Sequence, residues 1–222
     1  MNVRTAAWPM KLIPVAEAPA RVAEIVAALA AGGLACFPVR GAYRLAADAR
    51  SVDAITRLMQ SKRRARNHPT LILVADLAAA RSFVDGTTWQ TTERLAERLW
   101  PGPLTIVLPP SDELSPKLKK LLTRATGKLG IRVPSDPLTS AVLRQFGSPL
   151  LMSSANLEQK PGASSAATVR QRFVNAVDVW VDAGDVKPGP PSTIVEITET
   201  SWKIVREGAV PLADLERATA SA

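Results

Sequence analysis

Cationic side chains gather in one short stretch of the sequence, directly before an apolar run. The stretch QSKRRARNHPTLILV contains Lys62, Arg63, Arg64, Arg66 and His68. Lysine offers a compact charge, and arginine offers a planar fork that binds two phosphate oxygens together. The combination predicts binding of a polyphosphate, whereas the simpler interpretation of such a run is a solvated loop between a helix and a strand.

Polar side chains also stand at the ends of three further apolar segments. They are Arg132 in IRVP, Ser153, Ser154 and Asn156 in MSSANLEQKPG, and Ser192 and Thr193 in PGPPSTIVEI. Ligands of α/β proteins usually bind at strand ends, where hydroxyl and amide groups can hold phosphate or sugar oxygens. A cation inside a strand, such as Arg132, is explained if it projects into a cleft. The alternative for the serine and asparagine residues is a helix cap or a turn.

Composition excludes several kinds of site. The chain of 222 residues has one cysteine and one histidine, so we expect no internal disulfide, no histidine-based metal centre and no serine-histidine-carboxylate triad. The motifs GxxxxGK(S/T), GxGxxG, GxSxG and HExxH are absent from the sequence, which argues against a Walker-type NTPase and a dinucleotide fold. The net charge of +8 and the pI near 10.1 favour an anionic partner, such as a nucleotide, RNA or acidic lipid.

The sequence predicts a cytoplasmic protein with no membrane-spanning segment. The longest uncharged stretch near the N-terminus, residues 25–39, is about 15 residues long and too short to cross a bilayer. Glu17, Arg21 and Glu24 precede this stretch, and a signal peptide would not tolerate them.

The elements that must position these side chains alternate along the chain. Apolar spacing and capping residues predict helices at 17–31, 51–59, 76–84, 92–99, 137–146 and 166–173. Apolar runs predict strands at 34–39, 70–75, 104–109, 128–134, 149–154, 176–181, 192–197 and 202–208. Such alternation indicates one α/β domain, with a twisted sheet covered by helices. We expect disorder in the N-terminal arm and in the Ala-rich tail after about Leu212.

The order and spacing of six segments resemble the YrdC-like family of threonylcarbamoyl-AMP synthases, from Val22 to Gly208. These segments are KRRARNHPTLILV, LWPGPLTIVLP, GKLGIRVPSDP, LLMSSANLEQKPG, PSTIVEI and WKIVREG. The resemblance implies an α/β fold, in which a large twisted mixed sheet flanked by helices surrounds a basic concave cavity. It also implies an N-terminal arm at 1–12, a YrdC-like domain at 13–210 and a C-terminal tail at 211–222.

The resemblance further implies an ATP site and a reaction. The site residues that it implies are Lys62, Arg64, Arg132, Ser154, Asn156, Ser192, Thr193 and Arg206, and Lys62 and Arg64 are also expected to act in catalysis. The family condenses threonine, bicarbonate and ATP, with Mg²⁺ carried by the nucleotide, into threonylcarbamoyl-AMP and pyrophosphate. This intermediate serves the modification of adenosine 37 in tRNA. A threonine carbamate can attack the α-phosphorus directly, so the protein has to position charges rather than supply a nucleophile.

One segment departs from the family pattern. Relatives carry proline-threonine-acid-threonine-x-tyrosine-glycine-leucine after the first strand, a segment that helps to hold the amino acid, and this chain has PVRGAYRL. Pro38, Tyr43 and Leu45 agree with the pattern, whereas Val39, Arg40, Gly41 and Arg44 do not. Two hydroxyls and a carboxylate are replaced by two guanidinium groups, so an ammonium group would be repelled and an additional anion would be favoured.

Three hypotheses about function follow. The first is a threonylcarbamoyl-AMP synthase with an altered amino-acid loop. The second is a diverged paralogue that binds nucleotide or double-stranded RNA without this synthesis, and it predicts binding that depends strongly on salt. The third is an enzyme that activates a different carboxylate, with Arg40 and Arg44 binding that group.

Overall fold

The sheet of this protein contains ten strands in the order β1-β8-β2-β3-β7-β4-β6-β5-β9-β10. The structure, a computed structural model, describes residues 10–62, 70–123, 126–156, 164–198 and 201–220. The strands are β1 Lys11–Pro14, β2 Ala35–Val39, β3 Ala42–Asp48, β4 Leu71–Leu73, β5 Leu104–Leu108, β6 Leu129–Arg132, β7 Leu150–Ser154, β8 Val179–Asp182, β9 Thr193–Ile197 and β10 Trp202–Arg206. Parallel pairs (β4 with β6, β5 with β9) and antiparallel pairs (β3 with β7, β5 with β6) both occur. The α/β fold with a large mixed sheet, predicted from the sequence, is therefore confirmed.

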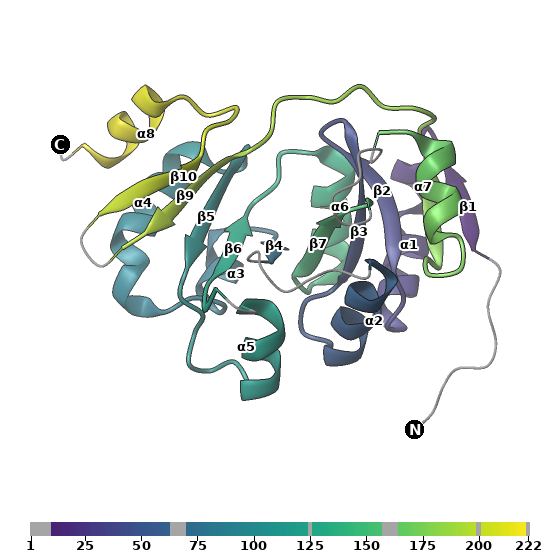
Figure 1. The fold of residues 1–222 in the computed structure, drawn as a ribbon, viewed down its shortest axis with the longest axis horizontal. Coiled ribbons are helices and arrows are strands. Elements are labelled where there is room, and N and C mark those ends of the chain that lie inside the picture. Colours follow the sequence, from purple (N-terminus) through teal and green to yellow (C-terminus); the bar gives the residue numbers. More distant parts are fainter. Residues whose placement is uncertain (1–9, 63–69, 124–125, 157–163, 199–200, 221–222) are drawn as a thin grey trace.

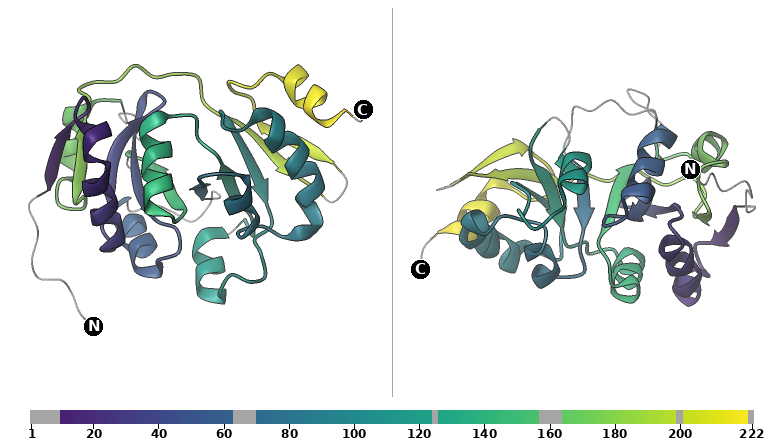
Figure 2. Two further views of the ribbon diagram at one scale, coloured as in Figure 1. Left: turned by 180° about the vertical axis from the view of Figure 1, so that it is seen from behind. Right: turned by 90° about the horizontal axis from the view of Figure 1, so that it is seen from below.

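Helices cover both faces of this sheet. They are α1 Val22–Ala30, α2 Val52–Lys62, α3 Leu77–Arg81, α4 Trp89–Leu99, α5 Pro116–Thr123, α6 Pro137–Phe146, α7 Ala166–Phe173 and α8 Leu212–Thr219, with 3-10 turns at Ala18–Arg21 and Gly86–Thr88. The helices α1 and α6, side by side in Figures 1 and 2, pack on one face of the sheet, whereas the buried side chains of α2, α4 and α5 belong to the apolar cluster on the other face. Side chains of α1 and α6 pack with those of β2, β7 and β8 into one apolar cluster. None of the helices in the described ranges is long and apolar enough to cross a membrane.

Capping residues begin several helices where the sequence predicts them. The Ser51 hydroxyl accepts a hydrogen bond from the Ala54 amide at 3.2 Å at the start of α2. Asp76 accepts from the Ala79 amide at 2.8 Å, and Asp136 accepts from the Thr139 amide at 2.9 Å. A side-chain acceptor at this position satisfies an amide that has no partner inside the helix, so each bond fixes the start of its helix.

Three elements are not predicted from the sequence, and one prediction about order is wrong. No element predicted from the sequence corresponds to β1, β3 or α5. The expected disordered tail instead forms α8, which packs against α4 with Leu215 fully buried and Ala218 3% exposed. The buried stripe of α8 consists of Leu215 and Ala218, too short a pattern in an Ala-rich segment to predict a helix from the sequence. The boundaries predicted for the arm, the domain and the tail stay predictions.

A two-residue turn joins β2 to β3 and lies beneath a crossing segment of the chain. Arg40 and Gly41 have φ angles of 50° and 73°, the left-handed pair typical of a tight hairpin turn. The segment of residues 183–192, here called the strap, runs from β8 to β9 across the top of the molecule (Figure 1). A Cβ atom on Gly41 would lie 2.0 Å from the Lys187 carbonyl oxygen, so the strap can pack on this turn only over a glycine.

Candidate functional site

A cavity of about 700 Å³ lies against one face of the sheet, between the middle strands and the β9–β10 pair. Alternate residues of three strands face it, namely Thr105 and Val107 on β5, Gly130 and Arg132 on β6, and Ile194 and Glu196 on β9, and Met152, Ser153 and Ser154 of β7 also line it. Successive side chains of a strand point to opposite faces, so this period of two shows that one surface of the sheet forms the wall.

Gly130 keeps the floor of the cavity open. A Cβ atom at this position would lie 3.0 Å from Cγ2 of Thr105 and 3.3 Å from the carbonyl oxygen of Thr70. Both distances are tight, so a larger side chain would have to displace its neighbours or project into the cavity. The limited space around this position therefore explains why the KLGIRVP segment has a glycine there.

Three of the predicted site residues, Lys62, Ser154 and Asn156, contact one another at one side of the cavity. Lys62 is the last residue of α2 and is 4% exposed. Its Nζ donates to the Ser153 hydroxyl at 2.9 Å and also to the Ser154 carbonyl oxygen. The Ser154 hydroxyl in turn donates to Oδ1 of Asn156. A buried ammonium needs such acceptors, and the contacts hold its charge beside the hydroxyls that line the cavity.

Arg132 projects into the cavity from β6, which confirms the expectation that a cation inside this strand faces a cleft. It is 3% exposed and donates to the Ser192 hydroxyl. Burial, followed by the charges of Arg44, Arg40 and Arg206, lowers its pKa to about 10. Its Nε is buried without a hydrogen-bond partner in the described part of the chain.

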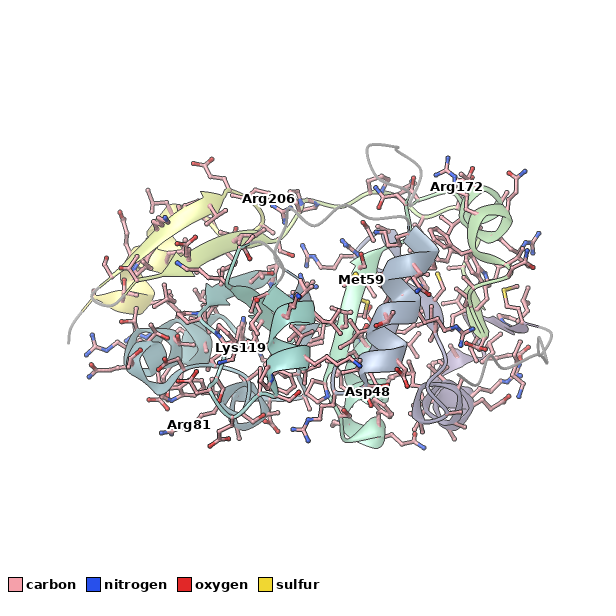
Figure 3. The ribbon with its side chains drawn as sticks, turned by 60° about the horizontal axis from the view of Figure 1, so that its bottom comes forward. Asp48, Met59, Arg81, Lys119, Arg172 and Arg206 are labelled. Carbon is pink, nitrogen blue, oxygen red and sulfur yellow. The ribbon has the colours of Figure 1, made fainter. Side chains whose placement is uncertain are left out.

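Arg206 and Thr193 are placed differently from each other. Arg206, labelled in Figure 3 at the end of β10, lines the cavity and donates from Nη2 to the Ser192 carbonyl oxygen at 2.7 Å. The Thr193 side chain is fully buried, and its hydroxyl donates to the Val210 carbonyl at 2.8 Å and accepts from the Val210 amide at 2.9 Å. Arg206 is therefore in position to contact a ligand, whereas the observed contacts of Thr193 tie β9 to the chain before α8. Its contact with nucleotide stays a prediction.

The residues of the divergent PVRGAYRL segment divide between two surfaces. Arg44 lines the large cavity and also a smaller one of about 140 Å³ beneath the strap, which Arg40 lines too. Arg40 donates to the Pro190 carbonyl at 3.2 Å. Tyr43 points to the opposite face, stacks on Trp180 at 4.8 Å between ring centroids, and donates to the Gly184 carbonyl at 2.7 Å. Pro38 pairs with Tyr43 across the hairpin. Of the four residues predicted to form the substrate loop, Pro38, Arg40, Tyr43 and Arg44, the two arginines therefore line a cavity, together with Gly41 and Ala42 of the same turn.

Some predicted residues cannot be placed, and some cavity residues were not predicted. Arg64, like Arg63, Arg66 and His68, lies outside the described residues. Lys128 and Glu196 line the cavity and form an ion pair at 2.7 Å, which holds the pKa of Glu196 below its ordinary value. The period of two in KLGIR and TIVEI puts Lys128 on the Arg132 face and Glu196 on the Ile194 face, so the signal was present in the sequence.

Comparison with known proteins identifies the family. The family model named Sua5_yciO_yrdC and described as "Telomere recombination" matches residues 27–208. The chain belongs to this Sua5/YciO/YrdC family. The resemblance identified from the six sequence segments is therefore confirmed.

Two members of the Sua5/YciO/YrdC family show how far the sequence likeness extends. A threonylcarbamoyl-AMP synthase of Pyrococcus abyssi is 30% identical over 186 residues, which cover 84% of this chain and 53% of the relative. A putative threonylcarbamoyl-AMP synthase of Mycobacterium tuberculosis H37Rv is 31% identical over 189 residues, covering 85% of this chain and 84% of the relative. This chain thus spans about half the length of the Pyrococcus relative, and a similar 56% of the one from Bacillus subtilis.

Solved structures of the family agree with the fold. P. abyssi Sua5 complexed with L-threonine has a TM-score of 0.81 and 27% identity, covering 94% of this chain and 60% of that one. E. coli YciO, at 22% identity, has a TM-score of 0.74 over 93% of this chain and 98% of its own, and it supports the fold alone.

Proposed function

We propose that this chain binds ATP in the large cavity and condenses it with threonine and bicarbonate to give threonylcarbamoyl-AMP and pyrophosphate. The observation that carries the proposal is the convergence of family-motif side chains from distant segments on one cavity. Lys62 from α2, Arg132 from β6 and Arg206 from β10 lie at this cavity or bond to residues that line it. The likeness to curated threonylcarbamoyl-AMP synthases supports the choice of reaction.

The proposed mechanism needs positioning and charge neutralisation rather than a covalent nucleophile. The threonine amine attacks the carbon of bicarbonate and gives a carbamate as a C–O bond breaks and water leaves, and a carbamate oxygen then attacks the α-phosphorus of ATP. The bond from the α-phosphorus to the oxygen bridging to the β-phosphate breaks, and pyrophosphate leaves with that electron pair. We assign neutralisation of the developing charge to Lys62 and Arg64, and binding of phosphate or sugar oxygens to Arg132, Ser154, Asn156, Ser192, Thr193 and Arg206.

Mg²⁺ is proposed to arrive on the nucleotide. Within the described residues, no group of three or more potential ligand side chains is arranged to hold a metal ion. Among the described residues that line the cavity, Glu196 carries a carboxylate, and this group already forms ion pairs with Lys128 and Lys203. Phosphate oxygens and water are sufficient ligands for Mg²⁺ in nucleotide sites, which fits this donor set.

The product is proposed to serve modification of adenosine 37 in tRNA, in the cytoplasm, where ATP and tRNA are found. Contact with tRNA or double-stranded RNA belongs to the same proposal, and the net charge of +8 favours it. A second candidate is activation of a different carboxylate, which is favoured by the positions of Arg40 and Arg44 at the cavities.

Pyrophosphate release tests the proposed reaction. We expect the purified chain to release pyrophosphate from ATP only when threonine and bicarbonate are both present. Lys62→Ala should lower this rate about a hundredfold, because a charge aimed at the transferring phosphate is lost. Arg144→Ala, which removes an exposed cation on α6, is the matched control and should retain the wild-type rate.

A folded wild-type protein that releases no pyrophosphate with threonine and bicarbonate would overturn the proposal. Release with another acid in place of threonine would establish the second candidate instead. Ser154→Ala provides an independent variant if Lys62→Ala does not fold, because the Ser154 hydroxyl lines the cavity while its burial is only partial.

A further inference from the structure

Four arginines surround the end of the strap where it joins β9. They are Arg40 from the β2–β3 turn, Arg44 from β3, Arg132 from β6 and Arg206 from β10. The pKa values of Arg44 and Arg132 are both lowered, mainly by burial and to a smaller extent by the charges of neighbouring arginines. Four like charges brought together in partly buried surroundings require a counter-charge.

Two of these arginines carry buried N–H groups that the described chain does not satisfy. Nε of Arg44 and Nε of Arg132 are both inaccessible to solvent and have no hydrogen-bond partner among the described residues. None of the ion pairs between described residues includes Arg44 or Arg132. A buried donor on a charged group is costly to leave without an acceptor, and such a group points to an acceptor that the folded chain itself does not supply.

The other polar groups nearby are already engaged. Glu196 binds Lys128 at 2.7 Å and Lys203 at 3.2 Å. The Ser192 hydroxyl accepts from Arg132, and the Ser192 carbonyl accepts from Arg206 at 2.7 Å. These contacts anchor the strap, and none of them supplies an acceptor to Nε of Arg44 or Arg132.

The position of Arg44 indicates where such a ligand would lie. Arg44, Pro191 and Ser192 line both the large cavity and the smaller one beneath the strap. Arg44 is paired with Ser154 in the β3–β7 register, so it extends the surface that holds Lys62 toward the strap. Arg44 thus lies at the boundary between the two cavities, with Arg40 lining the smaller cavity and Arg132 and Arg206 lining the larger one.

We propose that Arg44, which stands where the family pattern has a glycine, joins Arg132 at this boundary in binding one anionic group of the substrate, beyond the groups held at Lys62 and Ser154. A guanidinium fork binds carboxylate and phosphate oxygens in the same way. The group is therefore a carboxylate of the small acid or a phosphoryl group of the nucleotide. This inference rests on the proposed function only in placing the substrate in the large cavity.

Calorimetric titration of Arg44→Met tests the site without turnover. Pyrophosphate and malonate are titrated separately, as a phosphoryl and a carboxylate probe, and thermal melting is recorded without and with each anion. We expect the unliganded variant to melt at or above the wild-type temperature, because repulsion of Arg132 is removed. Affinity for at least one probe should fall about tenfold or more, as expected for loss of a charge-assisted hydrogen bond. Arg44→Lys should restore part of the lost affinity, and Arg144→Met, at an exposed position, should bind both probes with the wild-type affinity.

The outcomes separate the two sources and also the two proposals. Weakening for malonate alone assigns the carboxylate, and weakening for pyrophosphate alone assigns the phosphoryl group. No binding of either probe to the wild type, or unchanged affinities in a folded variant, would overturn the site, as would a clear drop in the unliganded melting temperature. Arg44-dependent anion binding without pyrophosphate release would contradict only the proposed function. Normal pyrophosphate release with no effect of Arg44→Met would contradict only this site.

Discussion

At the scale of single residues, the balance of charge around the cavity rests on a few buried contacts. Lys62 and Arg132 are almost fully buried and bind serine oxygens, so their charges stay where an anion would enter. Glu196 contributes a negative charge to this wall. Its side chain is 19% exposed and forms ion pairs with both Lys128 and Lys203. This carboxylate neutralises the β9–β10 edge of the wall and leaves the strap end cationic.

Glu196→Gln should destabilise the protein at neutral pH but not in acid. Lys128 and burial act in opposite directions on Glu196, and the net effect lowers its pKa. Its contribution to stability is therefore fully present above the ordinary glutamate pKa and is lost as the pH falls through the lower folded value. We expect a loss of about 1 kcal/mol or less in the free energy of unfolding near pH 7, which shrinks as the pH falls below the ordinary glutamate pKa and through the lower folded value.

Urea unfolding near pH 7 and in acid, below the ordinary glutamate pKa, measures the effect of Glu196→Gln on the free energy of unfolding. Glu113→Gln, at an exposed position, is the control and should change neither free energy. An equal loss for Glu196→Gln at both pH values would mean that packing, rather than the ion pairs with Lys128 and Lys203, accounts for its role.

At the scale of elements, the β2–β3 hairpin and the strap depend on each other. The tight turn at Arg40 and Gly41 leaves room for the strap, and Arg40 and Arg206 each bind a strap carbonyl. The strap in turn places Ser192 against Arg132. A change in the turn should therefore be felt at the cavity, although the turn itself lies outside it.

Gly41→Ala should reduce both stability and anion affinity. Gly41 and Gly147 both have left-handed φ angles, of 73° and 67°, but a Cβ atom meets the Lys187 oxygen at 2.0 Å only at Gly41 and meets nothing within 4 Å at Gly147. Both alanine variants should lose about 1 kcal/mol through the strained φ, and Gly41→Ala should lose about 1–3 kcal/mol more.

Urea unfolding and pyrophosphate titration of the two variants provide the measurement. Pyrophosphate affinity should fall for Gly41→Ala, because Ser192 shifts with the strap, and should stay unchanged for Gly147→Ala. Equal losses of stability in the two variants would show that the strap does not pack on the turn in solution.

At the scale of the whole molecule, the sheet brings together segments that are far apart in sequence. The order β3-β7-β4-β6-β5-β9-β10 lets side chains from residue 44 to residue 206 face one cavity, and α4 and α8 close the opposite face of the β5–β9 half. The net charge of +8 also extends an attractive field to any anion. Cavity cations and surface cations should nevertheless respond differently to salt, because buried charges are screened less.

Binding of ATP and of RNA should therefore differ in salt dependence. Between about 50 mM and 200 mM salt, we expect ATP affinity to fall only a few-fold, because its phosphates contact buried cations. Any binding of double-stranded RNA should weaken by about a thousandfold or more over the same range, since many counterions are released. Titrations of both ligands at the two ionic strengths provide the test. An ATP affinity that falls as steeply as that for RNA would place the nucleotide on surface charges and outside the cavity.

Much of the secondary structure follows from patterns within a few residues. The caps at Ser51, Asp76 and Asp136 begin helices where the sequence predicts them, and the strands carrying Arg132 and Ser154 lie within the predicted ranges. The exceptions depended on context: β3 is a strand because β2 and β7 pair with it on both sides, and α8 is a helix because Leu215 packs toward α4.

The sequence by itself predicted the kind of site, because lysine, arginine, serine and asparagine at strand and helix ends are residue types that bind phosphate in many folds. It also determined the family, since the motifs and their order survive at about 30% identity. Only the tertiary structure decided that Arg44 faces the cavity while Tyr43 packs on Trp180, and that Thr193 bonds to Val210. The physical reason is that strand register and the path of the strap depend on pairings between residues more than a hundred positions apart, which local spacing does not specify.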